Sequence, residues 1–168
     1  QIYSDLGRIW YEKLERDRNA LESWERVLDI DPANAGALMH IAEIYRAGSQ
    51  WHELVDTLHR IIEVGAATLD DQALENVYMQ LGYLYYSELE QPMDAVDAYR
   101  NVLQVNPSSF EAMDAVEHIH REEGQWEEAI EIMEQRVLAR QDTGQKIAEL
   151  LTVARTWEEQ VAEEDRGT

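Results

Sequence analysis

The chain has 168 residues, of which 45% are hydrophobic, and it contains no cysteine. This length and composition suit one domain with a buried core, and the missing cysteine excludes a disulfide framework and a thiol nucleophile. The 35 acidic and 14 basic residues give a net charge of −21. Nucleic acid is therefore not expected as a partner, because such a surface repels a polyanion.

Apolar residues recur at helical spacing along the chain, and no alternating strand pattern competes with them. Asp31-Pro32 and Asn106-Pro107 each end a helix, and each proline is expected to open the next one. Asp70 or Asp71 is expected to cap the fifth helix. In chain order we predict helices over 2–13, 17–30, 34–47, 51–64, 69–88, 92–105, 109–123, 126–140 and 144–165.

Two stretches of the chain match without a gap when the sequence is shifted by 75 positions. Such a register indicates an array of one structural unit, and arrays of this kind usually bind partners. The first stretch contributes Leu6, Gly7, Tyr11, Leu14, Glu15, Ala20, Val27, Leu28, Pro32, Arg46, Gln50, Trp51 and Glu53. The second contributes Leu81, Gly82, Tyr86, Leu89, Glu90, Ala95, Val102, Leu103, Pro107, Arg121, Gln125, Trp126 and Glu128.

A shorter pattern of small and large residues lies inside this period. It comprises Tyr3, Leu6, Gly7, Trp10, Ala20, Trp24, Val27 and Pro32, and again Tyr78, Leu81, Gly82, Tyr85, Ala95, Tyr99, Val102 and Pro107. These spacings resemble the tetratricopeptide repeat motif W-x2-L-G-x2-Y…A-x3-F…P, with one extra residue between the two helices. The half-a-tetratricopeptide repeats of RNA-processing factors share the aromatic spacing, but the Leu-Gly pairs favour the tetratricopeptide family.

The resemblance implies an all-α fold, an α-solenoid of about nine helices in antiparallel pairs that wind into a right-handed superhelix. We expect a single array over 1–168, with repeats near 1–33, 35–68, 75–108 and 110–143 and a terminal helix at 144–165. Gly7 and Gly82 remove bulk where helices cross, and large aromatic residues fill the neighbouring space. Glu117 and Arg136 replace small residues of the motif, so we expect the fourth pair to pack less closely.

The ends of the sequence lead to further expectations. The chain begins with Gln1 and ends on a helix without a mate, so we expect it to be a piece of a longer protein. No apolar run approaches the roughly 18 residues of a membrane span, and no signal peptide is recognisable, so we predict a cytoplasmic protein without membrane insertion.

A peptide groove is implied by the same resemblance, because ligands of this family usually lie against the inner helices, the first helix of each pair. Carried over position by position, the predicted groove residues are Arg8, Tyr11, Met39, Glu43, Arg46, Asn76, Met79, Tyr83, Tyr86, His118, Arg121 and Arg155. Four of the fourteen basic residues and three tyrosines are among them. They suit an extended peptide that carries carboxylates. The alternative is that each arginine pairs with an acid one turn away, as Glu43 could with Arg46, or Arg155 with Glu158 or Glu159.

One well-known form of this groove is not reproduced. Tetratricopeptide domains that clamp the carboxylates of heat-shock chaperones carry Lys and Asn at the fifth and ninth positions of successive inner helices. Here those positions hold Ser4, Arg8, Met39, Glu43, Met79 and Tyr83. Chaperone binding is therefore not predicted.

Enzyme chemistry has little support in the sequence. His118 and Glu122 have the i,i+4 spacing of a helical metal pair, but no third ligand accompanies them. The chain has no glycine-rich phosphate loop and no G-x-S-x-G motif. We predict no catalysis, no metal and no cofactor.

The sequence therefore predicts a scaffold that binds a protein or peptide partner in its groove. The alternative function is a structural array that assembles a larger complex through its ends or its acidic convex face. The terminal helix 144–165 also presents an apolar stripe, which predicts self-association through this end. That stripe consists of Ile147, Leu150, Leu151, Val153 and Trp157.

Overall fold

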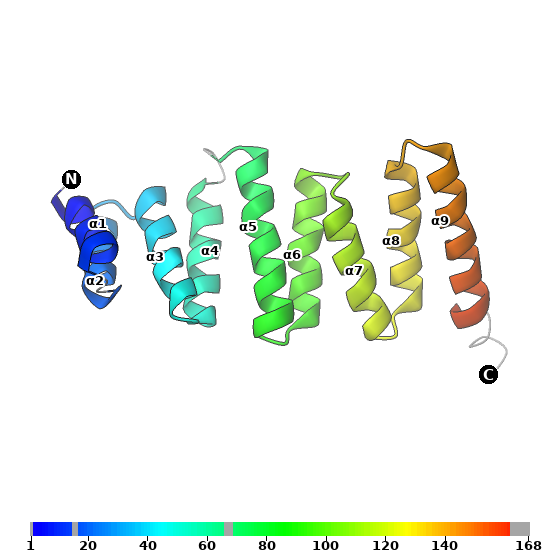
Figure 1. The fold of residues 1–168 in the computed structure, drawn as a ribbon, viewed down its shortest axis with the longest axis horizontal. Coiled ribbons are helices and arrows are strands. Elements are labelled where there is room, and N and C mark those ends of the chain that lie inside the picture. Colours follow the sequence, from blue (N-terminus) through cyan, green and yellow to red (C-terminus); the bar gives the residue numbers. More distant parts are fainter. Residues whose placement is uncertain (1, 15–16, 66–68, 162–168) are drawn as a thin grey trace. The chain divides into compact units, whose positions relative to one another are not determined.

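The structure, a computed structural model, describes residues 2–14, 17–65 and 69–161 (Figure 1). These residues form nine α-helices and two short π-helices, and no strand occurs among them, so the all-α prediction is confirmed. The α-helices are α1 (Ile2–Leu14), α2 (Asp17–Ile30), α3 (Ala35–Ala47), α4 (Trp51–Gly65), α5 (Asp71–Tyr83), α6 (Pro92–Val105), α7 (Phe110–Glu122), α8 (Trp126–Ala139) and α9 (Thr143–Thr156). The π-helices are η1 (Leu84–Glu88) and η2 (Trp157–Val161). None of the described helices is long and apolar enough to cross a membrane.

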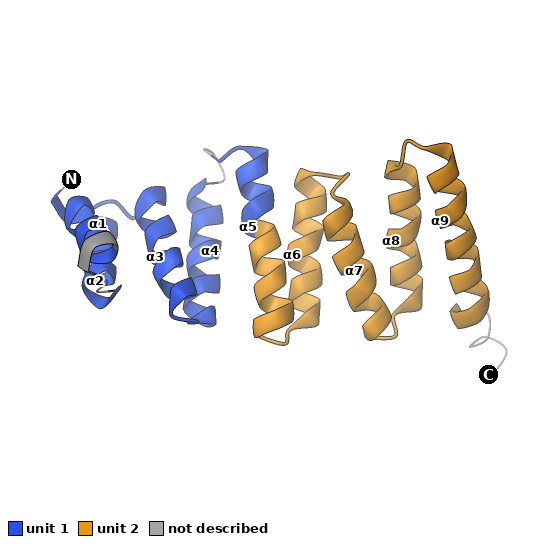
Figure 2. Cartoon of the chain, viewed as in Figure 1, with its two compact units in different colours: residues 1–77 blue, residues 78–168 orange. Residues whose placement is uncertain are grey.

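The chain divides into two compact units, Gln1–Val77 and Tyr78–Thr168, with the boundary inside α5 (Figure 2). In unit 1, α1 packs on α2, α2 on α3, and α3 on α4. In unit 2, η1 packs on α6, α6 on α7, α7 on α8, and α8 on α9. Consecutive helices therefore cover one another within each unit, which is how a helical repeat buries its apolar surface.

Two glycines let consecutive helices approach each other. A Cβ atom at Gly7 would lie 2.5 Å from Cε2 of Trp24, and one at Gly82 would lie 2.5 Å from Cε1 of Tyr99. Both aromatic rings are buried, so a side chain at either glycine would push against a packed ring. The small-on-large packing expected from the repeat is therefore present in both units.

The core of each unit is apolar. Leu38 and Leu54 are fully buried in unit 1. In unit 2, one cluster includes Val96 and Val116, and a second joins α8 to α9. This second cluster consists of Ile130, Met133, Val137 and Val153. Burial of such side chains is the main contribution to the stability of the array.

Polar side chains set where several helices begin. The side chain of Asn34 accepts a hydrogen bond of 3.0 Å from the N–H of Ala37, and Asp142 accepts one of 2.8 Å from Gln145. Asp70 accepts one of 2.8 Å from Ala73, so of the two predicted caps Asp70 is the residue that starts α5. The side-chain oxygens satisfy amide groups that have no partner inside the helix.

Most predicted helix boundaries lie within one residue of the observed ones, and three further differences occur. Pro32 and Pro107 lie in turns, so the prediction that they open helices was wrong; Asn34 and Ser109 precede the first helical residues instead. The predicted helix 69–88 begins at Asp71 and becomes π-helical at Leu84. The predicted helix 144–165 starts at Thr143 and is π-helical from Trp157, and its residues 162–165 lie outside the described part of the chain.

Candidate functional site

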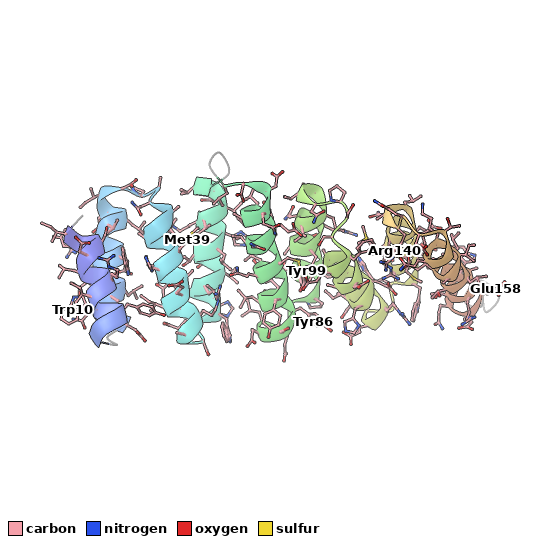
Figure 3. The ribbon with its side chains drawn as sticks, turned by 45° about the horizontal axis from the view of Figure 1, so that its top comes forward. Trp10, Met39, Tyr86, Tyr99, Arg140 and Glu158 are labelled. Carbon is pink, nitrogen blue, oxygen red and sulfur yellow. The ribbon has the colours of Figure 1, made fainter. Side chains whose placement is uncertain are left out.

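The predicted groove residues of unit 1 lie on α1, α3 and α5, and several of them interact with side chains on their own helix. Arg8 lies 3.6 Å from Asp5, with both side chains exposed. Glu43 lies 3.4 Å from His40, and Arg46 also takes part in an interaction within the chain. Among the rest of this set, Tyr11 is half-buried, Met39, which is labelled in Figure 3, is 46% exposed, and Asn76 Oδ1 lies 3.4 Å from Gln72 Nε2.

Two predicted groove residues of unit 2 are in direct contact with each other. The rings of Tyr86 on η1 and His118 on α7 meet edge to face with centroids 5.9 Å apart, and the Tyr86 oxygen lies 3.1 Å from His118 Nε2. Tyr86 donates its hydroxyl hydrogen to Glu122, whose carboxylate is 3.6 Å from the same imidazole nitrogen. Since that hydrogen is used by Glu122, Nε2 of His118 must be the donor to the tyrosine oxygen.

The carboxylate of Glu122 raises the pKa of Tyr86 above its ordinary value of 10.0, chiefly through this hydrogen bond, with burial and the negative charge adding to the effect. Ionised tyrosine cannot donate the bond and is repelled by the carboxylate. The stability that the bond contributes is therefore present below the ordinary pKa and is lost as the pH rises through the raised value.

Glu122→Gln is expected to lower the pKa of Tyr86 towards 10.0, because the amide carries no charge to oppose the phenolate. The measurement is an alkaline titration of tyrosinate absorbance for the protein and the variant, with Tyr86→Phe removing the signal of this one group. An unchanged titration after Glu122→Gln would show that the carboxylate does not bond to Tyr86 in solution.

The remaining predicted residues of unit 2 differ in their surroundings. Arg121 lies 3.2 Å from Glu117 and its guanidinium is 5.7 Å from the centroid of the Trp126 ring. Tyr83 is 57% exposed, Arg155 is exposed, and Met79 packs at the edge of the core. Pairing of an arginine with an acid one turn away is thus confirmed for Arg8 and Arg121.

An ion-pair network that the sequence did not predict joins α7, α8 and α9. Arg136 places Nη1 2.5 Å from Glu117 and 2.5 Å from Asp114, and its Nε is 3.5 Å from Glu149. Arg140 lies 2.9 Å from Glu149 and over the ring of Phe110, at 4.1 Å. The side chains of Arg136 and Glu117 are only 13% and 11% exposed. Burial alone would lower the pKa of Arg136, but the adjacent carboxylates of Glu117 and Asp114 raise it above its ordinary value.

The signal for this network was present in the sequence. Glu117 and Arg136 both depart from the repeat motif, they have opposite charges, and they belong to the same helix pair. In the structure the side chains of Arg136 and Glu117 form an ion pair with each other. The looser packing that we expected for this pair stays a prediction.

Two of the histidines outside the predicted groove residues pack within the fold. His120 is buried, with Nδ1 2.6 Å from the side-chain oxygen of Gln125, and His40 stacks on Trp24 with ring centroids 4.4 Å apart. Within residues 2–14, 17–65 and 69–161, no three His, Cys, Asp or Glu side chains are grouped closely enough to hold a metal ion.

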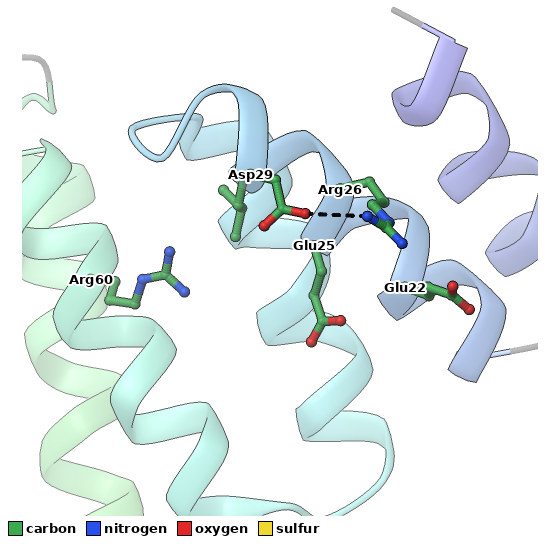
Figure 4. A pocket seen from close by; sticks show the side chains of 6 residues that line it. Glu22, Glu25, Arg26, Asp29 and Arg60 are labelled. Atoms are coloured by element: carbon green, nitrogen blue, oxygen red, sulfur yellow. Dashed lines mark ion pairs between the residues drawn. The ribbon is translucent and has the colours of Figure 1, made fainter.

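Two pockets of the described residues lie away from the predicted groove residues. One, of about 510 Å³, lies between α2 and α4 and is lined mainly by charged side chains, including Glu25, Asp29 and Arg60 (Figure 4). Arg26, which also lines it, lies 3.8 Å from Asp29. The other, of about 620 Å³, lies between α8 and α9. None of the twelve predicted groove residues lines either pocket, so the groove itself stays a prediction.

Consecutive packed helices, glycine-to-aromatic packing and the 75-residue period define a helical-repeat protein. Family models described as "Tetratricopeptide repeat" match residues 76–109 and 112–147. Over these two stretches the sequence matches the tetratricopeptide repeat family.

Three similar proteins illustrate the relationship. Sperm-associated antigen 1 of Mus musculus is 38% identical over 52 residues, which are 31% of this chain and 6% of that protein. The MamA protein structure has a TM-score of 0.58 at 18% identity and covers 94% of this chain and 91% of its own. YrrB, described as a TPR protein with an unusual peptide-binding site, has a TM-score of 0.57 at 16% identity and covers 93% and 75%. At such identities the two structures show the shared fold.

Proposed function

We propose that this chain is a non-catalytic scaffold that binds an extended peptide or partner segment on the exposed surface of its inner helices. The observation that carries the proposal is the contact between Tyr86 and His118. These residues were assigned to one surface from two different repeats, and a contact between them requires that both point to the same side of unit 2. The fold likeness to YrrB, which is described as having a peptide-binding site, supports the same function.

The side chains on this surface suit a peptide that carries carboxylates. Tyr83 presents an exposed aromatic ring with a polar tip, and Arg121 presents a half-exposed guanidinium. The pair of Arg8 with Asp5 does not exclude a ligand, because both side chains are exposed and such ion pairs contribute only about 0–1 kcal/mol. A ligand carboxylate is therefore able to join or replace the acidic partner.

Paired charge reversals test this proposal. Arg46→Glu combined with Arg121→Glu is expected to weaken the binding of acidic peptides with free C-terminal carboxylates by more than about tenfold, because attraction becomes repulsion at two predicted contacts. The measurement is fluorescence anisotropy of a labelled peptide set. Arg18→Glu with Arg26→Glu, two exposed residues on α2, is the matched control with the same change in net charge.

The control variant separates the effect of local contacts at Arg46 and Arg121 from the effect of the changed net charge of the protein. If both double variants weaken binding equally, or neither does, the arginines of the inner helices have no specific role. Circular dichroism of each variant shows that its helices are intact, which matters because Arg121 neighbours the Glu117 ion pair.

A structural array that uses its acidic outer face is the second candidate. The α2–α4 pocket favours it, because Glu22, Glu25 and Asp29 bring three carboxylates to the outer helices of unit 1. The two basic side chains that line the same pocket, Arg26 and Arg60, offset part of this charge. Binding of a basic protein that Glu22→Lys with Glu25→Lys abolishes would favour this candidate over the groove.

A further inference from the structure

Tyr86, His118 and Glu122 bring three metal-ligating atoms to one point on the surface of unit 2; Tyr86 is labelled in Figure 3. His118 Nε2 lies 3.1 Å from the Tyr86 oxygen and 3.6 Å from a carboxylate oxygen of Glu122, and those two oxygens share a hydrogen bond. The sequence offered only the pair of His118 with Glu122, which by itself predicted no metal. The fold adds a third donor, from a tyrosine 32 positions before the histidine.

The separations of these atoms suit three ligands of one small cation. Bonds from a transition-metal ion to nitrogen or oxygen are about 2.0–2.2 Å long, so neighbouring ligands of a tetrahedral or octahedral ion lie about 2.8–3.6 Å apart. Both distances from His118 Nε2 lie within this range. The oxygens of Tyr86 and Glu122 are closer to each other because the hydroxyl hydrogen lies between them. An ion that replaces this hydrogen moves the two oxygens apart.

The repeat itself does not require His118 or Glu122. Under the 75-residue shift their positions are taken by Glu43 and Ala47, and all four residues are exposed. Exposed positions of this kind usually tolerate substitution with little change in stability. The combination of imidazole and carboxylate is therefore a feature of the second copy, and packing of the core does not account for it.

The types of donor atom select the class of ion. Imidazole suits Zn²⁺, Cu²⁺, Ni²⁺ and iron, whereas Mg²⁺ and Ca²⁺ prefer sites built from oxygen ligands alone. Glu122 and an ionised Tyr86 each carry one negative charge, so together they balance a divalent ion. Arg121 adjoins Glu122 in the chain, but its guanidinium lies at Glu117, 3.2 Å away. The net charge of −21 also favours the approach of a cation.

We propose that Tyr86, His118 and Glu122 bind a divalent transition-metal ion such as Zn²⁺. Glu122 supplies a carboxylate oxygen, Tyr86 its phenolate oxygen and His118 its Nε2, and water completes the coordination. The hydroxyl proton of Tyr86 passes to the solvent, and the imidazole hydrogen lies on Nδ1, which leaves Nε2 free to coordinate. The bound ion joins η1 to α7 and so stabilises the folded chain.

The test titrates the metal-free chain with Zn²⁺ at neutral pH and follows tyrosinate absorbance, because coordination ionises the phenol. We expect the signal to saturate at one ion per chain and to be absent in Tyr86→Phe, which keeps the ring and removes only the oxygen. His118→Ala and Glu122→Gln are each expected to weaken the binding of Zn²⁺ by about tenfold or more. The matched control is His40→Ala with Glu43→Gln, which removes another exposed His–Glu pair, 3.4 Å apart on α3, and leaves the titration unchanged.

Each outcome decides the proposal. Zn²⁺ binding that produces no tyrosinate signal, or that is equally strong in Tyr86→Phe, overturns it, because the acidic surface alone would then hold the ion. An equal loss in the control variant also overturns it. Peptide binding measured in the presence of a chelator tests the scaffold function alone, and the Zn²⁺ titration contains no peptide. Failure of one proposal is therefore distinguishable from failure of the other.

Discussion

Arg136→Ala is expected to lower the free energy of unfolding by about 3 kcal/mol, because it leaves Glu117 without its closest cation in a nearly covered position. Glu117 keeps only the more exposed Arg121, at 3.2 Å. Replacement of both, Glu117→Ala with Arg136→Ala, restores small residues to the two motif positions. It removes both charges together, so we expect a loss of only about 1 kcal/mol, since a buried ion pair is often replaceable by apolar residues at little cost.

The measurement is urea denaturation followed by circular dichroism, arranged as a double-mutant cycle. Arg26→Ala is the matched control: it breaks the exposed pair with Asp29, at 3.8 Å, and is expected to change stability by under about 0.5 kcal/mol. If Arg136→Ala costs no more than Arg26→Ala, or if the effects of the two single changes simply add, the network does not stabilise the fold as described.

Gly82→Ala is expected to lower the free energy of unfolding by about 2 kcal/mol, because the new Cβ would lie 2.5 Å from the buried ring of Tyr99. The ring or the helix must shift to accept the methyl group. Helix propensity alone would make the same substitution stabilising by about 1 kcal/mol, so the sign of the effect reports the packing.

Gly36→Ala is the matched control inside α3, where a Cβ would meet only Asn34 Oδ1, at 3.5 Å. We expect this variant to be as stable as the parent protein or more so. Tyr99→Leu combined with Gly82→Ala is expected to cost less than the sum of the two changes, because the smaller side chain makes room for the methyl group. A Gly82→Ala variant as stable as Gly36→Ala would contradict the close approach of α5 and α6.

Part of the candidate site could be predicted from the sequence. The placement of Tyr86 and His118 on one surface followed from their positions in the repeat, and their contact agrees with it. The pairing of Arg8 with Asp5 and Arg121 with Glu117 followed from helical spacing, which brings residues three and four apart to the same face.

Other parts of the site could not be predicted from the sequence, because they depend on contacts between helices. The hydrogen bond from Tyr86 to Glu122 joins residues 36 positions apart, and Arg136 meets Asp114 across 22 positions. Spacing within one helix gives no distance between such residues. The prediction that Pro32 and Pro107 open helices was wrong. Both prolines lie in turns, and the helices that follow begin after Asn34 and Ser109.

The sequence by itself determined the order of the helices, the repeat period and the small residues beneath Trp24 and Tyr99, because these depend on residue size at fixed spacing along each helix. Only the tertiary structure decided that Glu117 and Arg136 are partners and that Ala154 lines a pocket together with four glutamates. Ion pairing and coverage are set by the distances between side chains of different helices, and those distances exist only once the helices have packed.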